Sequence, residues 1–204
     1  RLDSGATVVI GASVGIAFYP TDAQTGAALL QRADTAMYAA KQRGSGVYCV
    51  YSPDLSQAIR DRLELEGRLS RAVSEGLLEI LFQPQVRLSD GQMVGVEALC
   101  RWHDEELGEV SPQVFIPIAE ETGLIRPLGL WLLRQAWRDL LGWGREEGFF
   151  LAINVSTRQL TDDFADLVRE LIGTCQECGT RLEMELSEVS LVKAPPEVGE
   201  RLGA

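Results

Sequence analysis

The chain has 204 residues and a formal net charge of -11, with 46% hydrophobic and 24% charged residues. This composition is that of a globular protein with room for one large domain or two small ones. We expect no nucleic-acid partner, because gripping a phosphate backbone needs clustered Lys and Arg. No apolar run reaches the ~18 residues of a membrane span, and there is no signal-peptide pattern, so we expect a cytoplasmic chain without a membrane segment.

The first 50 residues contain two strand-like stretches with a helix between them. Residues 8–19 are β-branched and apolar and stop at Pro20-Thr21-Asp22, which is a turn signal. Residues 25–42 carry apolar side chains at helical spacing, and a short strand is expected over residues 47–51. Two strands and one helix are too little for an independent core. Because the chain starts at Arg1 and not at Met, we expect this segment to be the end of a larger domain in a longer protein.

Residues 53–75 are predicted to form a connector helix. Ser52 can cap it, and Pro53 falls at the first helical position, where its missing N–H costs nothing. Four apolar side chains form a short seam of nearly helical period, and they are Ile59, Leu63, Leu69 and Val73. Such a seam is compatible with a homodimer, although so few turns support it weakly.

From residue 78 onward, strand-like and helical stretches alternate. Strands are expected over residues 78–88, 94–99, 149–155 and 182–186, and helices over 112–122, 129–143, 161–178 and from Pro196 onward. Alternating β and α units indicate an α/β fold with a parallel sheet. Four strands followed by the end of the chain in mid-helix suggest an interrupted barrel.

Acidic and amide side chains stand late in three of these strands or just after them, and they are Glu97, Asn154, Glu185 and Glu188. In parallel barrels the C-terminal ends of the strands form the active-site rim. Buried carboxylates that converge without a partner are costly, so several of them together need a cation. All the ligands are oxygens, which favours Mg²⁺ or Mn²⁺. Arg101, four residues after Glu97, suits a phosphate oxygen, and the whole set suits phosphodiester cleavage by an activated water.

The cysteines do not indicate a zinc site or a disulfide framework. Cys175 and Cys178 form a CxxC pair, but a structural zinc site needs two such pairs or a pair with histidines. The only histidine, His103, is far away in the sequence. We expect reduced thiols.

Five motifs in order resemble those of the EAL cyclic-di-GMP phosphodiesterase family. Glu97-Ala98-Leu99-Cys100-Arg101 resembles the signature that names the family. The other four stretches are residues 82–85 (FQPQ), 110–125, 153–156 (INVS) and 185–188 (ELSE), the last with Ser187 where Thr is usual.

The first part of the chain resembles the C-terminal end of a diguanylate-cyclase-type GGDEF domain. The matching stretches are residues 12–17 and 33–41, with the glycines that follow. In that family the lysine equivalent to Lys41 tends to meet nucleotide phosphates, although a solvated lysine at a helix end is the commoner case. The signature loop of the family would lie upstream of Arg1, so the resemblance implies no cyclase activity in this chain.

The resemblance implies a fold and a domain order. We expect the C-terminal part of an α+β GGDEF domain over residues 1–52, a connector helix over 53–75, and the N-terminal half of an EAL domain over 76–204. The EAL fold is a modified TIM-like barrel whose first strand is antiparallel.

The resemblance also implies an activity, which is hydrolysis of cyclic-di-GMP to pGpG with Mg²⁺ or Mn²⁺. By position, Glu97, Asn154 and Glu185 match metal ligands, Gln83 and Arg101 match ligand-contacting residues, and Glu188 stands beside the metal set with a catalytic role that is less defined. The later motifs of the family lie past Ala204, so we expect this chain alone to be inactive. Two alternatives stay open: a degenerate domain that binds cyclic-di-GMP without cleaving it, and a non-catalytic dimerisation or interaction module.

Overall fold

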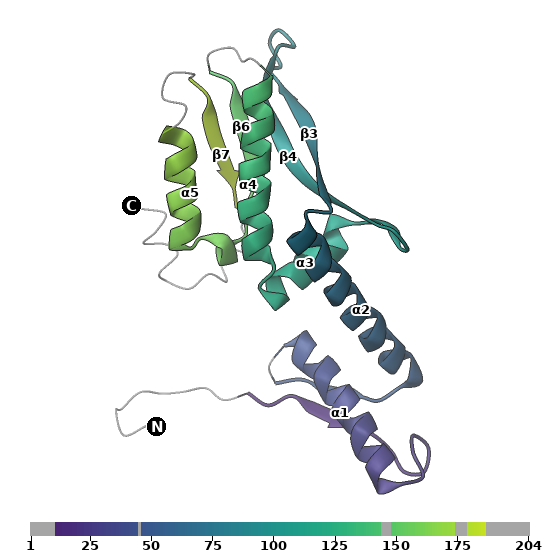
Figure 1. Cartoon of the computed structure of the whole chain (residues 1–204). Helices are drawn as coiled ribbons and strands as arrows, with labels where there is room; N and C mark the ends of the chain where they lie inside the picture. The colour runs from purple at the N-terminus through teal and green to yellow at the C-terminus, as the bar shows by residue number, and fades with distance from the viewer. Residues whose placement is uncertain (1–10, 45, 144–147, 174–178, 187–204) are drawn as a thin grey trace, which may run out of the picture. The chain divides into compact units, whose positions relative to one another are not determined.

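A computed structural model describes residues 11–44, 46–143, 148–173 and 179–186. The chain divides into two compact units, Arg1–Leu65 and Glu66–Ala204, which are described separately (Figure 1). The division falls inside one helix, and the predicted domain boundaries at residues 52 and 76 stay predictions. No helix in the described ranges is both long enough and apolar enough to cross a membrane.

The first unit is a β–α–β arrangement. Strands β1 (Val14–Ile16) and β2 (Tyr48–Val50) pair in parallel, and helix α1 (Gly26–Arg43) connects them. Gly15 allows β1 to lie directly against α1, because a Cβ at this position would stand 2.0 Å from the carbonyl oxygen of Ala33. The elements agree with the prediction except that β1 is short: only residues 14–16 of the predicted 8–19 are a strand among the described residues.

A small core joins α1 to β2 and to the following helix. Its buried members are Ala36, Ala39, Ala40 and Cys49. Leu55 and Ile59, from the start of α2 (Pro53–Glu75), pack against this core. The predicted cap of α2 is present, since the Ser52 hydroxyl accepts the N–H of Leu55 at 3.3 Å.

The apolar seam of α2 is largely used inside the chain. Leu69 has no exposed surface, and Ile59 packs in the first unit, whereas Leu63 is 50% exposed. Most of the seam is therefore not presented for pairing with a second copy.

The second unit is built on a mixed sheet in the order β3–β4–β6–β7, with β5 attached to β4. The strands are β3 (Leu78–Val86), β4 (Met93–Asp104), β5 (Gly108–Val110), β6 (Phe150–Asn154) and β7 (Arg181–Glu185). β3 and β5 run antiparallel to β4, and the pairs β4–β6 and β6–β7 are parallel. The antiparallel first strand agrees with the expectation from the family resemblance.

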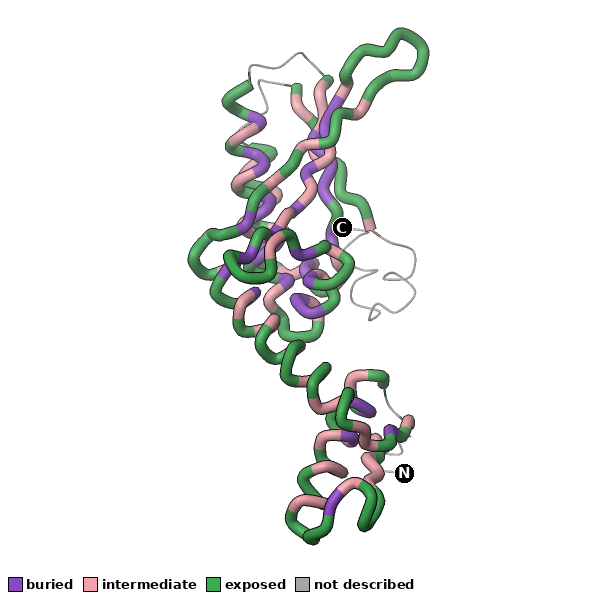
Figure 2. The backbone as a smooth tube through the Cα atoms, turned by 90° about the vertical axis from the view of Figure 1, so that its right-hand side faces the viewer, coloured by how far each residue is buried: buried purple, intermediate pink, exposed green. Residues whose placement is uncertain are grey.

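Helices α4 (Ile125–Gly142) and α5 (Asp162–Gly173) lie against one face of this sheet, and α3 (Pro112–Thr122) lies near the lower end of α4 (Figure 1). A short helix η1 (Thr157–Gln159) follows β6. Leu133, Ala136, Trp137 and Leu140 of α4 are buried against Val96, Ala98, Leu151 and Ile153 of the strands and Phe164 and Leu167 of α5. Figure 2 shows buried backbone concentrated in these strands and in the helix sides that face them.

Two parts of the second unit differ clearly from the prediction, and two others are not tested. β4 continues to Asp104, well past the predicted end at residue 99, because residues 100–102 pair with the start of β3 and residues 102–104 pair with β5, a strand that the prediction lacked. α4 begins four residues before the predicted start at 129, since Pro127 lies in its first turn, where backbone N–H groups have no partner within the helix. The end of the predicted helix 161–178 and the helix from Pro196 lie outside the described residues.

Candidate functional site

Side chains alternate strictly along β4, so the strand has one core face and one polar face. Val96, Ala98, Cys100 and Trp102 are buried on the side of the helices. Glu97, Leu99 and Arg101 point to the other face, because successive residues of a strand point to opposite sides. β6 is buried on both faces over Leu151, Ala152 and Ile153, and only its last residue, Asn154, is exposed.

Strand register brings four of the predicted site residues onto this polar face. Gln83 of β3 lies directly opposite Glu97, and Asn154 lies directly opposite Glu185. Glu97 is paired with Ala152, two residues before Asn154, so Asn154 is its diagonal neighbour. The Asn154 Nδ2 donates a hydrogen bond to Glu97 Oε1 at 2.6 Å. Residues that are 57 positions apart in sequence therefore meet on one face.

The position of these residues along their strands is only partly as expected. Asn154 and Glu185 are the last residues of β6 and β7. Glu97 is not at the end of β4, which runs on for seven further residues to Asp104. It does lie where the parallel ladder between β4 and β6 ends, since the last pair is Ala98 with Ile153. The residues thus meet where the parallel pairing ends.

Arg101 lies on the same face of β4, four residues beyond Glu97. Its Nη1 donates to the carbonyl oxygen of Cys100 at 2.9 Å. Burial raises the pKa of the Cys100 thiol to about 12, and the Cys100 side chain lies on the face of β4 opposite to that of Glu97. The usable ligands around Glu97 are then oxygens.

The geometry of Glu97, Asn154 and Glu185 is compatible with a hard divalent cation. Two oxygen ligands on adjacent corners of an octahedral site lie ~3 Å apart when each is about 2.1 Å from the ion. The 2.6 Å between the Asn154 carboxamide and the Glu97 carboxylate is close to this value. Turning the carboxamide about its Cβ–Cγ bond would exchange Nδ2 for Oδ1 and present the oxygen to a cation. Within the described residues, no three His, Cys, Asp or Glu side chains group together, so the asparagine is needed to complete a set of three.

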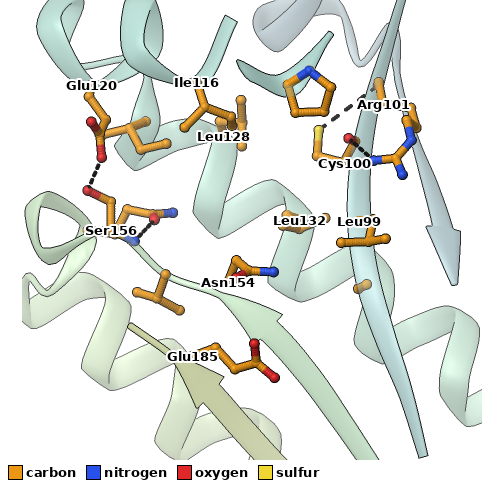
Figure 3. Close-up of a pocket in the computed structure, with 15 residues that line it drawn as sticks. Leu99, Cys100, Arg101, Ile116, Glu120, Leu128, Leu132, Asn154, Ser156 and Glu185 are labelled. Carbon is orange, nitrogen blue, oxygen red and sulfur yellow. Dashed lines mark hydrogen bonds between the residues drawn. The ribbon is translucent and has the colours of Figure 1, made fainter. Parts of the chain in front are cut away.

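A cavity of about 330 Å³ opens beside these residues (Figure 3). Asn154, Glu185, Leu99 and Arg101 line one part of it, and Ile116, Leu128 and Leu132 from α3 and α4 line an apolar part. Figure 3 shows that Asn154 and Glu185 come from neighbouring strands. The cavity therefore joins polar groups to an apolar wall, which is the usual make-up of a small-molecule site.

Glu120 and Ser156 also line this cavity; both lie in the family-like stretches 110–125 and 153–156, but neither was predicted to be a site residue. The Ser156 hydroxyl donates to Glu120 Oε1 at 2.5 Å. Ser156 also begins η1 in a capping box with Gln159. The pattern Ser-x-x-Gln was a sequence signal for that box, but nothing local pointed to Glu120. Glu188 and the Cys175–Cys178 pair lie outside the described residues.

Two family models together match most of the chain. A family model described as "EAL domain" matches residues 66–202, which is more than half of the chain. The chain belongs to the EAL domain family. A second model, "Diguanylate cyclase, GGDEF domain", matches residues 2–46, so an EAL match follows a GGDEF match along the chain.

Some curated relatives of this EAL chain are named as enzymes of cyclic di-GMP turnover. The bifunctional diguanylate cyclase/cyclic di-GMP phosphodiesterase MucR of Pseudomonas aeruginosa is 40% identical over 189 residues, covering 91% of this chain and 28% of MucR. The cyclic di-GMP phosphodiesterase PdeR of Escherichia coli is 37% identical over 191 residues, with the same two shares. The chain thus spans little more than a quarter of the length of these relatives.

Solved EAL structures resemble the chain as well. A MucR phosphodiesterase in complex with cyclic-di-GMP has a TM-score of 0.60 and 31% identity, covering 69% of this chain and 58% of that one. An EAL enzyme in a cAMP- and cyclic-di-GMP-bound form has a TM-score of 0.62 and 28% identity, covering 72% of this chain and 42% of that one. A Vibrio cholerae S helix-GGDEF-EAL structure of LapD, 14% identical with a TM-score of 0.56, covers 87% of this chain and 43% of that one and bears on the fold alone.

Proposed function

We propose that the EAL part of this chain binds cyclic-di-GMP and supplies half of a phosphodiesterase site that cleaves it to pGpG. In this proposal Glu97, Asn154 and Glu185 hold a Mg²⁺ or Mn²⁺ ion, and Gln83 and Arg101 contact the nucleotide. Glu188 acts beside them. The sheet is the first part of a TIM-like barrel whose inside is the polar face, and residues 1–52 are the end of a GGDEF domain.

One observation carries this proposal: Gln83, Glu97, Asn154 and Glu185 share one sheet face, with Asn154 bonded to Glu97 at 2.6 Å. Asn154 is bonded to Glu97 and paired across the strands with Glu185, so the three side chains offer an all-oxygen set of the kind that a hard divalent cation prefers. The relatives named as cyclic di-GMP phosphodiesterases, and the cyclic-di-GMP complex of MucR, support the choice of nucleotide.

The side chains would share the work as follows. Arg101 lies on the polar face, where its planar guanidinium can bind a phosphate oxygen in a bidentate way. Gln83, opposite Glu97, can orient the sugar-phosphate by its amide. The apolar wall of the cavity, from Ile116, Leu128 and Leu132, can receive a purine ring. A divalent ion, when bound, polarises the phosphodiester and acidifies the attacking water.

Titration calorimetry with cyclic-di-GMP tests this function on the chain itself. We expect the chain to bind cyclic-di-GMP in the presence of Mg²⁺ and to bind it more weakly when EDTA removes the metal. Binding should also weaken in Glu97→Gln, which loses the charge of the side chain and keeps its shape. Glu109→Gln, on the exposed middle residue of β5, is the control and should bind as the wild type does. Equal binding with and without Mg²⁺ would contradict the metal assignment.

Formation of pGpG distinguishes an enzyme from a receptor that only binds cyclic-di-GMP. The chain covers 58% of the MucR phosphodiesterase chain, and we propose that groups in the remainder of such a domain are needed for turnover. The chain alone should then form no pGpG, whereas a version extended by the remainder of the MucR domain should form it. Tight nucleotide binding by that extended protein without pGpG would favour the receptor reading.

A homodimer and a cytoplasmic location remain parts of the proposal. The α2 seam gives the dimer little support, because Leu69 has no exposed surface. Sedimentation of the chain at rising concentration would test it, with Leu63→Glu as the variant that should keep the chain monomeric.

A further inference from the structure

We propose that Glu120 is a positioning residue: through Ser156 it fixes the loop after β6 and so aims the Asn154 carboxamide at the cation. The inference rests on the proposed function, in which Asn154 is a ligand of that cation. Glu120 itself lies near the end of α3, is not one of the proposed ligands, and acts only through the loop.

Glu120 holds the loop at two points. Its carboxylate accepts the hydroxyl of Ser156 at 2.5 Å, and its main-chain carbonyl accepts Nη1 of Arg158 at 2.8 Å. Figure 3 shows the first of these bonds at the edge of the cavity, with Asn154 on the same segment. Ser156 and Glu120 are 36 residues apart, so the bond ties α3 to the segment that follows Asn154.

The residue between Asn154 and Ser156 is fixed from the other side. The N–H of Val155 donates to the carbonyl oxygen of Glu185 at 2.8 Å. Asn154 is therefore followed by one residue tied to β7 and one tied to α3. A ligand side chain is oriented by the partners of its neighbours, and such partners are part of a metal site as much as the ligands are.

The chemistry of Ser156 makes a carboxylate the suitable partner. A hydroxyl has one proton to donate and two lone pairs. The proton goes to Glu120, while the Ser156 oxygen accepts the N–H of Arg158 at 3.4 Å and the Ser156 N–H donates to Gln159 Oε1 at 2.6 Å. A charged acceptor makes the strongest bond of this kind. Without the Glu120 carboxylate the hydroxyl is released to rotate, and η1 is tied to residue 120 only by the bond from Arg158 to the main-chain carbonyl.

The test uses the full chain and four variants: Glu120→Ala, Glu120→Gln, Ser156→Ala and the control Gln113→Ala, on an exposed residue of α3. Mn²⁺ affinity is measured by the selective paramagnetic broadening of backbone amides near residues 97, 154 and 185. We expect Glu120→Ala and Ser156→Ala to weaken Mn²⁺ binding by about tenfold, the usual cost of losing a partner of a ligand. Glu120→Gln keeps an acceptor oxygen and should retain most of the affinity, and Gln113→Ala should match the wild type.

A metal-free measurement separates positioning from general loss of structure. Hydrogen exchange at the Val155 amide should speed up in Glu120→Ala, while amides in the buried part of α4 exchange as in the wild type. If Glu120→Ala does not fold, Ser156→Ala decides, and wild-type Mn²⁺ affinity in that variant overturns the inference.

Asn154→Ala separates this inference from the proposed function. If Asn154→Ala abolishes the selective broadening while Glu120→Ala and Ser156→Ala leave it intact, the positioning role is wrong and the cation site stands. The proposed cation site itself is wrong if Mn²⁺ broadens the same amide signals in Asn154→Ala as in the wild type. It is also wrong if the wild type shows no selective broadening.

Discussion

Replacing Gly129 of α4 by Ala should destabilise the chain, which is the opposite of the usual result for a glycine inside a helix. Glycine to alanine inside a helix ordinarily stabilises by about 1 kcal/mol. Here the new Cβ would stand 1.7 Å from Nε2 and 2.8 Å from Cδ of the buried Gln159 side chain. Two well-packed groups cannot share that space, so either Gln159 or the helix must move.

The size of the effect follows from the two contacts that would be disturbed. Overpacking of this kind costs about 1–3 kcal/mol. Displacing Gln159 would also break its bond to the Ser156 N–H and the capping box of η1, a loss of about 1 kcal/mol. Against the gain of about 1 kcal/mol from helix propensity, the net loss in the free energy of unfolding is about 1–3 kcal/mol.

Urea unfolding followed by circular dichroism measures this difference, with Gly67→Ala as the matched control. Gly67 is exposed in α2, and nothing lies within 4 Å of a Cβ built there, so that change should stabilise. In a Gln159→Ala background the overlap disappears, and Gly129→Ala should become neutral or stabilising. If Gly129→Ala stabilises as much as Gly67→Ala in the wild-type background, the close packing of Gln159 on α4 is wrong.

Two further predictions concern charged groups. Backbone N–H groups of Glu106 and Leu107, together with Arg68 at 2.9 Å, hold the pKa of the buried Asp104 carboxyl below its ordinary value. A depressed folded pKa stabilises above the unfolded pKa of about 3.9 and ceases to do so as the pH falls through the folded value. The difference in the free energy of unfolding between the wild type and Asp104→Asn should therefore be constant above about pH 5 and shrink in acid. A difference that does not vary with pH would refute the lowered pKa of Asp104. Arg101→Lys keeps the charge and loses the planar fork, so cyclic-di-GMP affinity should fall about tenfold in calorimetry, and an unchanged affinity would leave Arg101 a structural role only.

The first residues of helices were predicted correctly where the sequence contains a capping residue. Ser52-Pro53 and Ser111-Pro112 each combine a capping side chain with a proline at the first helical position, and α2 and α3 begin at those prolines. The end of β4 had no such signal. Its last residues, which include Trp102 and Asp104, are kept in the strand by pairing with β5 and by Arg68, which is 36 residues away from Asp104.

The candidate site divides in the same way between local and distant information. Glu97, Asn154 and Glu185 stand late in strands that were expected to run parallel, so their grouping could be anticipated from the sequence. The bond from Asn154 to Glu97 and the bond from Ser156 to Glu120 depend on strand register and on the approach of α3, which no short segment encodes. Residues that act through a neighbour are for this reason the hardest to find in advance.

The most direct test of the account is anomalous diffraction from crystals of this chain grown with Mn²⁺ and cyclic-di-GMP. The account predicts a manganese peak at coordination distance from the side-chain oxygens of Glu97, Asn154 and Glu185, with a phosphate of the nucleotide on the side of Arg101. A peak at any other place, or the nucleotide bound with these three side chains ordered and no manganese between them, would contradict it.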